Sequence, residues 1–146
     1  MLRIYSVNER RESSVDAVID RILSEAKTVA VVGLSDKPER PSHAVARYLQ
    51  EKGYRVIPVN PFLAEVLREK AYQSLSDIPV RVDLVDVFRK SEAVPPIAEE
   101  AIRIGARFFW MQEGVVNFTA RDRLERAGIP VVMDLCMKKE LAKRGK

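Results

Sequence analysis

The sequence predicts an open α/β domain, a doubly wound, Rossmann-like parallel sheet of roughly five strands flanked by helices. Short apolar runs rich in β-branched residues alternate with segments whose apolar residues recur at helical spacing. The first such run ends in a glycine and leads through a basic loop into a helix, the order found in nucleotide-binding α/β folds. Residues 1–146 are expected to form a single domain, because this length supports one hydrophobic core.

The amino-terminal half predicts a helix followed by a βαβ unit. Ser14 to Ala26 carry apolar residues at helical spacing, with Ser13 or Ser14 as N-cap. Thr28 to Leu34 (TVAVVGL) is typical of a strand buried on both faces. Ser42 to Lys52 then predict a helix, and Tyr54 to Val59 a second strand, which gives a right-handed crossover.

The remaining elements continue the alternation of strands and helices. Phe62 to Pro79 fits either a short helix or an irregular strand. Further strands are expected at Val82–Phe88, Arg107–Met111 and Pro130–Met133, and helices at Ala93–Ile104 and Thr119–Ala127. If the sheet ends at Arg107–Met111 (RFFWM), that segment is exposed and suited to a homodimer contact.

Composition limits the class of protein. No stretch approaches the roughly 18 apolar residues of a membrane span, and the amino terminus lacks the apolar centre of a signal peptide, so a cytoplasmic protein is expected. The net charge of +4 is compatible with nucleic acid or with a phosphorylated ligand. The aromatic residues are not grouped with Lys and Arg as a stacking platform, which argues against nucleic acid. Gln and Asn are scarce, as in proteins from high-temperature organisms.

A ligand is expected beyond the carboxyl ends of the strands, beside the first strand. The loop after Gly33 carries Lys37 and Arg40 and feeds into a helix amino terminus, where free N–H groups attract phosphate. The alternative is a solvated loop in which Ser42 serves as N-cap.

The usual dinucleotide fingerprint is absent from this loop. Ser35 and Pro38 stand where the second and third glycines of G-x-G-x-x-G would be. The second strand ends in Val59-Asn60-Pro61, without the acidic residue that holds the ribose of NAD. Another phosphorylated nucleotide is therefore favoured, while an NAD(P)-dependent reductase, with Arg40 accepting a 2′-phosphate, stays open.

The run VAVVGLSDKPERPSHAVARYLQEKGYRVIPVNP resembles the opening of the small CoA-binding-domain proteins, which are similar to the amino-terminal domain of the succinyl-CoA synthetase α subunit. The likeness continues through nearly the whole chain, in YQSLSDIP, VDLVDVFR, WMQEG and MDLCMKKE. The resemblance implies a coenzyme A lying across the strand ends.

The resemblance also implies roles for particular residues. It implies close backbone approach at the Gly33-Leu34-Ser35 stretch, phosphate contacts from Lys37, Arg40 and Ser42, an adenosine site at Val59, Asn60 and Pro61, a cover from Phe88 and Arg89, and Gln112 near the outer end of the ligand. Phe88 is equally suited to the core, and Gln112 to capping the turn that follows it.

The chain departs from the family pattern at two places. Arg68 stands where many members have glycine, and Asp134-Leu135-Cys136 where they read Asp-Arg-Cys. Without the neighbouring Arg, a reactive role for the Cys136 thiol has less support. The single cysteine is either a small buried hydrophobe or a group near the pantetheine thiol that forms a mixed disulfide with CoA.

Residues for catalysis are scarce. His43, the single histidine, suits packing or a hydrogen bond near phosphate. Asp83, Asp86 and Asp134 are too scattered to make a metal site, and Asp83 and Asp86 are expected to face solvent or to pair with Arg or Lys. The resemblance implies non-catalytic binding of CoA or an acyl-CoA, the alternative being a CoA-ligase subunit that needs a partner.

Overall fold

The computed structural model describes residues 15–146. A leading helix spans residues 15–25, and the predicted N-cap at Ser13 or Ser14 lies outside the described residues. The strands are β1 (Thr28–Val32), β2 (Arg55–Val59), β3 (Glu65–Val66), β4 (Glu69–Lys70), β5 (Leu84–Val87), β6 (Phe108–Met111) and β7 (Val131–Val132). The labelled helices are α2 (Pro41–Glu51), α3 (Val94–Arg103), α4 (Phe118–Arg126) and α5 (Met137–Lys143), with 3₁₀ turns at Leu75–Asp77 and Ser91–Ala93.

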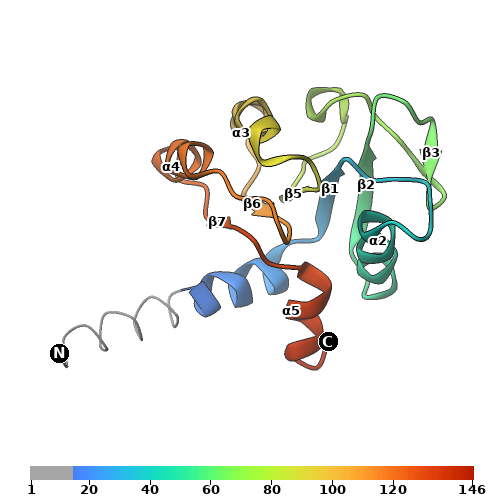
Figure 1. Ribbon diagram of the computed structural model, residues 1–146, viewed down its shortest axis with the longest axis horizontal. Coiled ribbons are helices and arrows are strands. Elements are labelled where there is room, and N and C mark those ends of the chain that lie inside the picture. The colour runs from blue at the N-terminus through green and yellow to red at the C-terminus, as the bar shows by residue number, and fades with distance from the viewer. Residues whose placement is uncertain (1–14) are drawn as a thin grey trace.

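The main sheet has the order β2-β1-β5-β6-β7, with every pair parallel (Figure 1). The chain runs from β1 outward to β2 on one side and returns to β5 on the other, so the strand order reverses at β1. This arrangement confirms the predicted doubly wound fold, and it puts the crevice for a ligand at the carboxyl ends of β1 and β5.

Helices bury apolar residues against both faces of the sheet. On one face the leading helix, α2 and α5 form a core cluster with Val29, Val31, Leu84, Phe108 and Trp110. On the other face α3 and α4 pack over Ala30, Val85, Val87 and Phe109. Because successive strand residues point to opposite faces, a continuous apolar run such as Val29–Val32 supplies both clusters.

In the carboxyl-terminal half the sheet does not end at β6, so the condition for an exposed RFFWM segment is not met, and one helix was not predicted. The segment RFFWM is not exposed: residues Phe108–Met111 have no accessible surface, because β6 lies inside the sheet and β7 forms its edge. Helix α5 was not anticipated, although Met137, Glu140 and Leu141 are buried at helical spacing.

The ambiguous segment between β2 and β5 contains a small antiparallel hairpin. Glu65 pairs with Lys70 and Val66 with Glu69. Leu67 and Arg68, the two residues of the turn, have φ of 53° and 64°. Two consecutive positive φ values define a type I′ turn, for which glycine is well suited. This explains physically why a glycine in place of Arg68 would serve the same turn.

Candidate functional site

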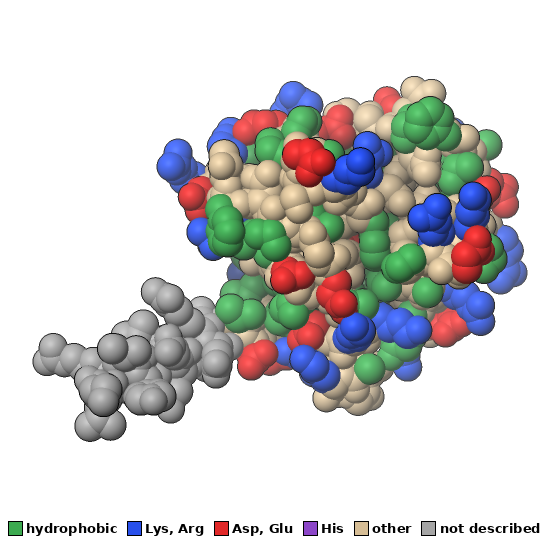
Figure 2. Space-filling view, viewed as in Figure 1, with side chains coloured by type: hydrophobic (Ala, Val, Ile, Leu, Met, Phe, Trp, Pro, Cys, Tyr) green, Lys and Arg blue, Asp and Glu red, His purple; other side chains and the backbone are tan. Residues whose placement is uncertain are grey.

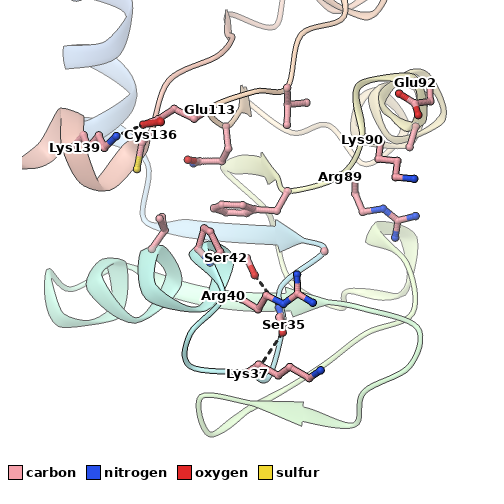
Figure 3. Close-up of a pocket in the computed structure, with 17 residues that line it drawn as sticks. Ser35, Lys37, Arg40, Ser42, Arg89, Lys90, Glu92, Glu113, Cys136 and Lys139 are labelled. Carbon is pink, nitrogen blue, oxygen red and sulfur yellow. Dashed lines mark hydrogen bonds and ion pairs between the residues drawn. The ribbon is translucent and has the colours of Figure 1, made fainter.

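A pocket of about 1220 Å³ opens beyond the carboxyl ends of β1, β5 and β6 (Figure 3). It brings together most of the residues predicted to bind a ligand: Gly33, Ser35, Lys37, Arg40, Ser42, Phe88, Arg89 and Gln112. It adds Pro41, Val45, Lys90, Glu92, Ala93, Glu113, Val115, Cys136 and Lys139. The site thus combines the loop before α2, the segment between β5 and α3, the end of β6 and the start of α5.

Gly33 joins the end of β1 to the end of β5. Its φ is 85°, and a Cβ at this position would lie 2.4 Å from the carbonyl oxygen of Phe88. Its N–H donates to the carbonyl oxygen of Val59 at 2.9 Å. Only glycine therefore fits there without displacing the end of β5, and close approach of a ligand to the backbone at Gly33 stays a prediction.

Two serines shape the loop that follows. The Ser35 N–H donates to Ser42 Oγ at 3.0 Å, and the Lys37 N–H donates to Ser35 Oγ at 3.1 Å. Ser42 lies in the first turn of α2 behind Pro41, and the N-cap position is Arg40, so Ser42 does not cap the helix. In both bonds the serine oxygen accepts, which leaves each hydroxyl hydrogen free to donate to a ligand.

Four cations border the pocket, and we call them the basic rim: Lys37, Arg40, Arg89 and Lys90. Figure 3 shows Lys37 and Arg40 on the loop before α2 and the other two on the segment leading to α3. All four are exposed, and within residues 15–146 none forms an ion pair with a carboxylate. The rim thus offers four cations without direct carboxylate partners, which suits phosphate, although Glu92 also lines the pocket beside Lys90 (Figure 3).

Opposite this rim, Lys139 Nζ lies 2.6 Å from Glu113 Oε1, and this hydrogen bond raises the pKa of Lys139. The pair links the end of β6 to α5. The charge at this side of the pocket is therefore largely neutralised, in contrast to the basic rim.

The inner wall of the pocket consists of Phe88, Gln112, Val115 and Cys136. Gln112 and Val115 are buried, while Phe88 and Cys136 are half-buried and pack against the core cluster of α2 and α5. Phe88 thus serves the core and the pocket together. Gln112 also accepts a backbone hydrogen bond from Val115 at 2.8 Å, so it does begin the following turn.

Asp86 lies behind Gln112 and corrects a prediction. It has no accessible surface, and its Oδ1 accepts a 2.7 Å hydrogen bond from Gln112 Nε2. It neither faces solvent nor pairs with Arg or Lys, because β5 is a central strand whose register places Asp86 between Val31 and Trp110. Burial raises the pKa of Asp86 to about 7, against the smaller lowering effect of the Gln112 bond.

Asp83 also differs from its prediction. Its Oδ2 accepts from the backbone N–H groups of Lys27 and Thr28, at 2.9 and 3.1 Å. It therefore ties the start of β1 to the start of β5, at the end of the sheet opposite the pocket, and is half-buried.

The remaining predicted residues do not line the pocket. Leu34 and Val59 are buried in the two core clusters. Asn60 donates to the Leu34 carbonyl oxygen at 3.1 Å and accepts from the Phe62 N–H at 2.9 Å. Pro61 is exposed beside it. Asn60 thus connects the loops that follow β1 and β2, and adenosine contacts at Val59, Asn60 and Pro61 stay predictions.

Some pocket residues were not predicted from the sequence. Lys90 and Glu113 belong to the strand-end segments where a ligand is expected, but no binding role was predicted for them. Lys139 depends on α5, which was not anticipated. The pocket lining does not include His43.

Residues 15–146 offer neither a metal site nor a membrane span. They contain no group of three or more His, Cys, Asp or Glu side chains placed to hold a metal ion. Within the same range, every helix is too short or too polar to span a bilayer.

On the face shown in Figure 2, basic and acidic side chains are intermixed, without a continuous basic stripe.

Comparison with known proteins decides the family. Residues 27–142 match the family model described as "CoA binding domain". The chain belongs to this CoA-binding-domain family. The match covers every strand of the main sheet and every residue that lines the pocket.

Relatives of this family member fall into two groups. The uncharacterized protein YneT of Bacillus subtilis is 48% identical over 122 residues, which are 84% of this chain and 90% of that protein. A hypothetical protein from Pyrococcus horikoshii has a solved structure with a TM-score of 0.85 and 41% identity, covering 88% of this chain and 90% of that one. The acetate–CoA ligase [ADP-forming] I subunit alpha of Pyrococcus furiosus is 33% identical over 91 residues, which are 58% of this chain but 20% of that subunit. The chain therefore matches small proteins along most of their length and ligases along a fraction.

Proposed function

We propose that this protein binds coenzyme A or an acyl-CoA in the pocket beyond β1, β5 and β6, and that it catalyses no reaction by itself. The phosphates contact the basic rim and the hydroxyl groups of Ser35 and Ser42. The pantetheine arm runs along the inner wall toward Gln112 and Cys136. Membership of the CoA-binding-domain family supports the choice of ligand.

The basic rim is the observation that carries this proposal. Lys37, Arg40, Arg89 and Lys90 surround one side of the pocket without carboxylate partners among residues 15–146. CoA bears phosphate groups at the 3′ and 5′ positions of its ribose, so several cations at separate positions suit it. The volume of about 1220 Å³ exceeds the roughly 300–1,000 Å³ of ordinary small-molecule pockets and has room for a nucleotide with a long arm.

A nicotinamide dinucleotide is the competing ligand. The end of β2 offers no carboxylate to an adenosine ribose, and both ends of the Asn60 side-chain amide are engaged within the protein. These observations favour CoA over NAD. For NADP, Arg40 remains available to a 2′-phosphate, so the experiment compares NAD(H) with NADP(H).

Calorimetry with CoA, acetyl-CoA, NAD(H) and NADP(H) in parallel tests the proposal. We expect CoA or acetyl-CoA to bind tightest, and Arg40→Ala to weaken this binding by about 1 to 3 kcal/mol, the scale of a charge-assisted hydrogen bond. Arg47→Ala is the control, because Arg47 is an exposed residue of α2 that pairs with Glu51 and does not line the pocket. Tighter binding of NADPH, or equal affinities for the Arg40→Ala and Arg47→Ala variants, would contradict the proposal.

A second candidate function is that of a ligase subunit, favoured by the likeness to the Pyrococcus furiosus ligase subunit. In this case a partner protein supplies the chemistry and this chain supplies the CoA site. The purified protein, mixed with ATP, acetate and CoA, is expected to form no ADP and no acetyl-CoA. Turnover by the protein alone would make it an enzyme in its own right.

In the proposed site Cys136 can form a mixed disulfide with CoA. It lines the pocket beside the inner wall and is half-buried. Its thiolate attacks a sulfur of CoA disulfide, one S–S bond forms to Cys136 as the other breaks, and one CoA leaves as thiolate. We expect mass spectrometry to show a single CoA adduct that dithiothreitol removes and that is absent from Cys136→Ser. An unmodified wild-type protein would place Cys136 among inert packing residues.

A further inference from the structure

The Asp86 carboxyl group lies directly behind the inner wall of the pocket. It has no accessible surface, and on its face of the sheet its register neighbours are Val31 on β1 and Trp110 on β6, both fully buried. Gln112 Nε2 is the donor to Oδ1. Among residues 15–146, Asp86 Oδ2 is the one buried side-chain nitrogen or oxygen without a hydrogen-bond partner. A carboxyl group in such surroundings is costly to retain for stability alone.

Gln112 connects this buried group to the pocket. The amide end that faces Asp86 is the N–H end, since Gln112 Nε2 lies 2.7 Å from Asp86 Oδ1. The ionised form of Asp86, which prevails above its pKa of about 7, can only accept this bond, so the affinities below are measured at pH 8. The carbonyl oxygen Oε1 is then the end of the amide that does not contact Asp86. Within the described residues no group donates to Oε1, and this oxygen is not among the buried unpartnered atoms. Since Gln112 lines the pocket, its Oε1 is open to a ligand.

We propose that Asp86 is a positioning residue that fixes the Gln112 amide with its carbonyl oxygen toward the pocket, where it accepts a hydrogen bond from the pantetheine arm of the ligand. This inference rests on the proposed function, because CoA binding supplies the arm. It adds a specificity element: the inner wall selects a ligand whose arm carries hydrogen-bond donors. Without Asp86 the amide has no fixed orientation and can offer either end.

Three kinds of donor on the arm would satisfy Gln112 Oε1. The amide N–H groups and the pantoyl hydroxyl are present in CoA and in acetyl-CoA, whereas the thiol S–H is present in CoA alone. The comparison of these two ligands therefore separates the thiol from the other donors. Adenosine 3′,5′-bisphosphate lacks the arm and reports on the basic rim by itself.

The experiment measures the affinities of the full-length protein for CoA, acetyl-CoA and adenosine 3′,5′-bisphosphate. Gln112→Met keeps most of the side-chain volume and removes the acceptor. We expect it to weaken CoA binding by about 3- to 10-fold, as for one hydrogen bond, while the affinity for the bisphosphate stays within about 2-fold. Equal losses for CoA and acetyl-CoA identify an amide N–H or the pantoyl hydroxyl as the donor, and a loss confined to CoA identifies the thiol.

Exchange of the two polar groups tests the positioning role. Asp86→Asn leaves an amide facing an amide, so CoA affinity should fall between wild type and Gln112→Met. Gln112→Glu alone places the introduced carboxyl group against that of Asp86, so two like charges face each other when both are ionised. In the double variant D86N/Q112E, the amide introduced on β5 donates its N–H to the carboxyl group introduced after β6, and an acceptor oxygen again faces the pocket. We expect the preference for CoA over the bisphosphate to return to within about 3-fold of wild type.

The possible failures are distinguishable. A wild-type protein that binds the bisphosphate no more weakly than CoA contradicts the inference, and one that binds neither contradicts the proposed function as well. An unchanged preference in Gln112→Met overturns the inference alone. If Gln112→Met does not fold, as judged by its thermal transition, D86N/Q112E against Asp86→Asn decides: an equal preference in these two variants refutes the positioning role.

Discussion

The basic rim and the inner wall of the same pocket are built in opposite ways. The rim consists of exposed side chains on segments between strands and helices, and in the loop before α2 two serine oxygens accept hydrogen bonds from the backbone. The inner wall consists of buried or half-buried side chains at the strand ends, backed by the carboxyl group of Asp86. Changes to the inner wall should therefore alter folding stability together with binding, whereas changes to the rim should alter binding alone.

Gly33 lies where the two regions meet, and we expect the largest effect there. Gly33→Ala requires a left-handed residue with a side chain and places its Cβ 2.4 Å from the Phe88 carbonyl oxygen. The left-handed conformation costs about 1–2 kcal/mol, and displacement of the backbone at Phe88 brings the total to about 3–5 kcal/mol of unfolding free energy. Urea unfolding followed by circular dichroism measures this loss.

Gly53→Ala is the matched control for this variant. Gly53 has φ of 94°, but no atom lies within 4 Å of the position its Cβ would take. The control therefore carries the left-handed cost without the steric overlap, about 1–2 kcal/mol. Equal losses in the two variants would show that the contact between Gly33 and Phe88 is not constraining.

The next largest effect concerns the inner wall and depends on pH. The pKa of Asp86 is raised from 3.8 to about 7 in the folded protein. Its protonated form is therefore favoured by folding, and the stability it contributes is complete below about pH 4 and is lost as the pH rises through 7. The unfolding free energy of wild type should fall, relative to Asp86→Asn, by at most about 4 kcal/mol between pH 4 and pH 8.

Urea titrations of both proteins at several pH values measure this difference. Other titrating groups are common to the two proteins and cancel in the comparison. Parallel stability curves across that range would mean that Asp86 is solvated in the folded state, which would remove the basis for its positioning role.

The sequence was informative for the rim and for Phe88 and Gln112 of the inner wall, but misleading for Asp86 behind that wall, and the reason is physical. Strand order and the loop at Lys37 and Arg40 follow from local patterns: β-branched runs, a glycine at a strand end and a helix behind it. The burial of Asp86 does not follow from a local pattern, because aspartate is seldom fully buried and a solvated position is the ordinary expectation. Its bond to Gln112 joins residues 26 positions apart and depends on the register of β5 and β6.

The carboxyl terminus shows where sequence signals are weak. RFFWM would be exposed only if it ended the sheet, and such an uninterrupted apolar run is typical of an interior strand. The short segment Val131–Val132 forms the edge instead, and α5 covers the core beyond it. A two-residue strand and a seven-residue helix give weak periodic signals, so Cys136 and Lys139 could not be assigned to the pocket from spacing.

The smallest expected effect on stability belongs to the rim, and it completes the comparison. Lys37 and Arg89 are exposed and lack ion-pair partners among residues 15–146, so removing both side chains withdraws no folded-state contact of consequence. The double variant Lys37→Ala/Arg89→Ala should unfold within about 0.5 kcal/mol of wild type. Its affinity for CoA should nevertheless fall, and the decline of affinity between low and high salt should become shallower, because fewer cations face the phosphates. Denaturation and calorimetry at two salt concentrations measure both quantities. A variant that loses stability while keeping its salt dependence would reverse the division between rim and inner wall.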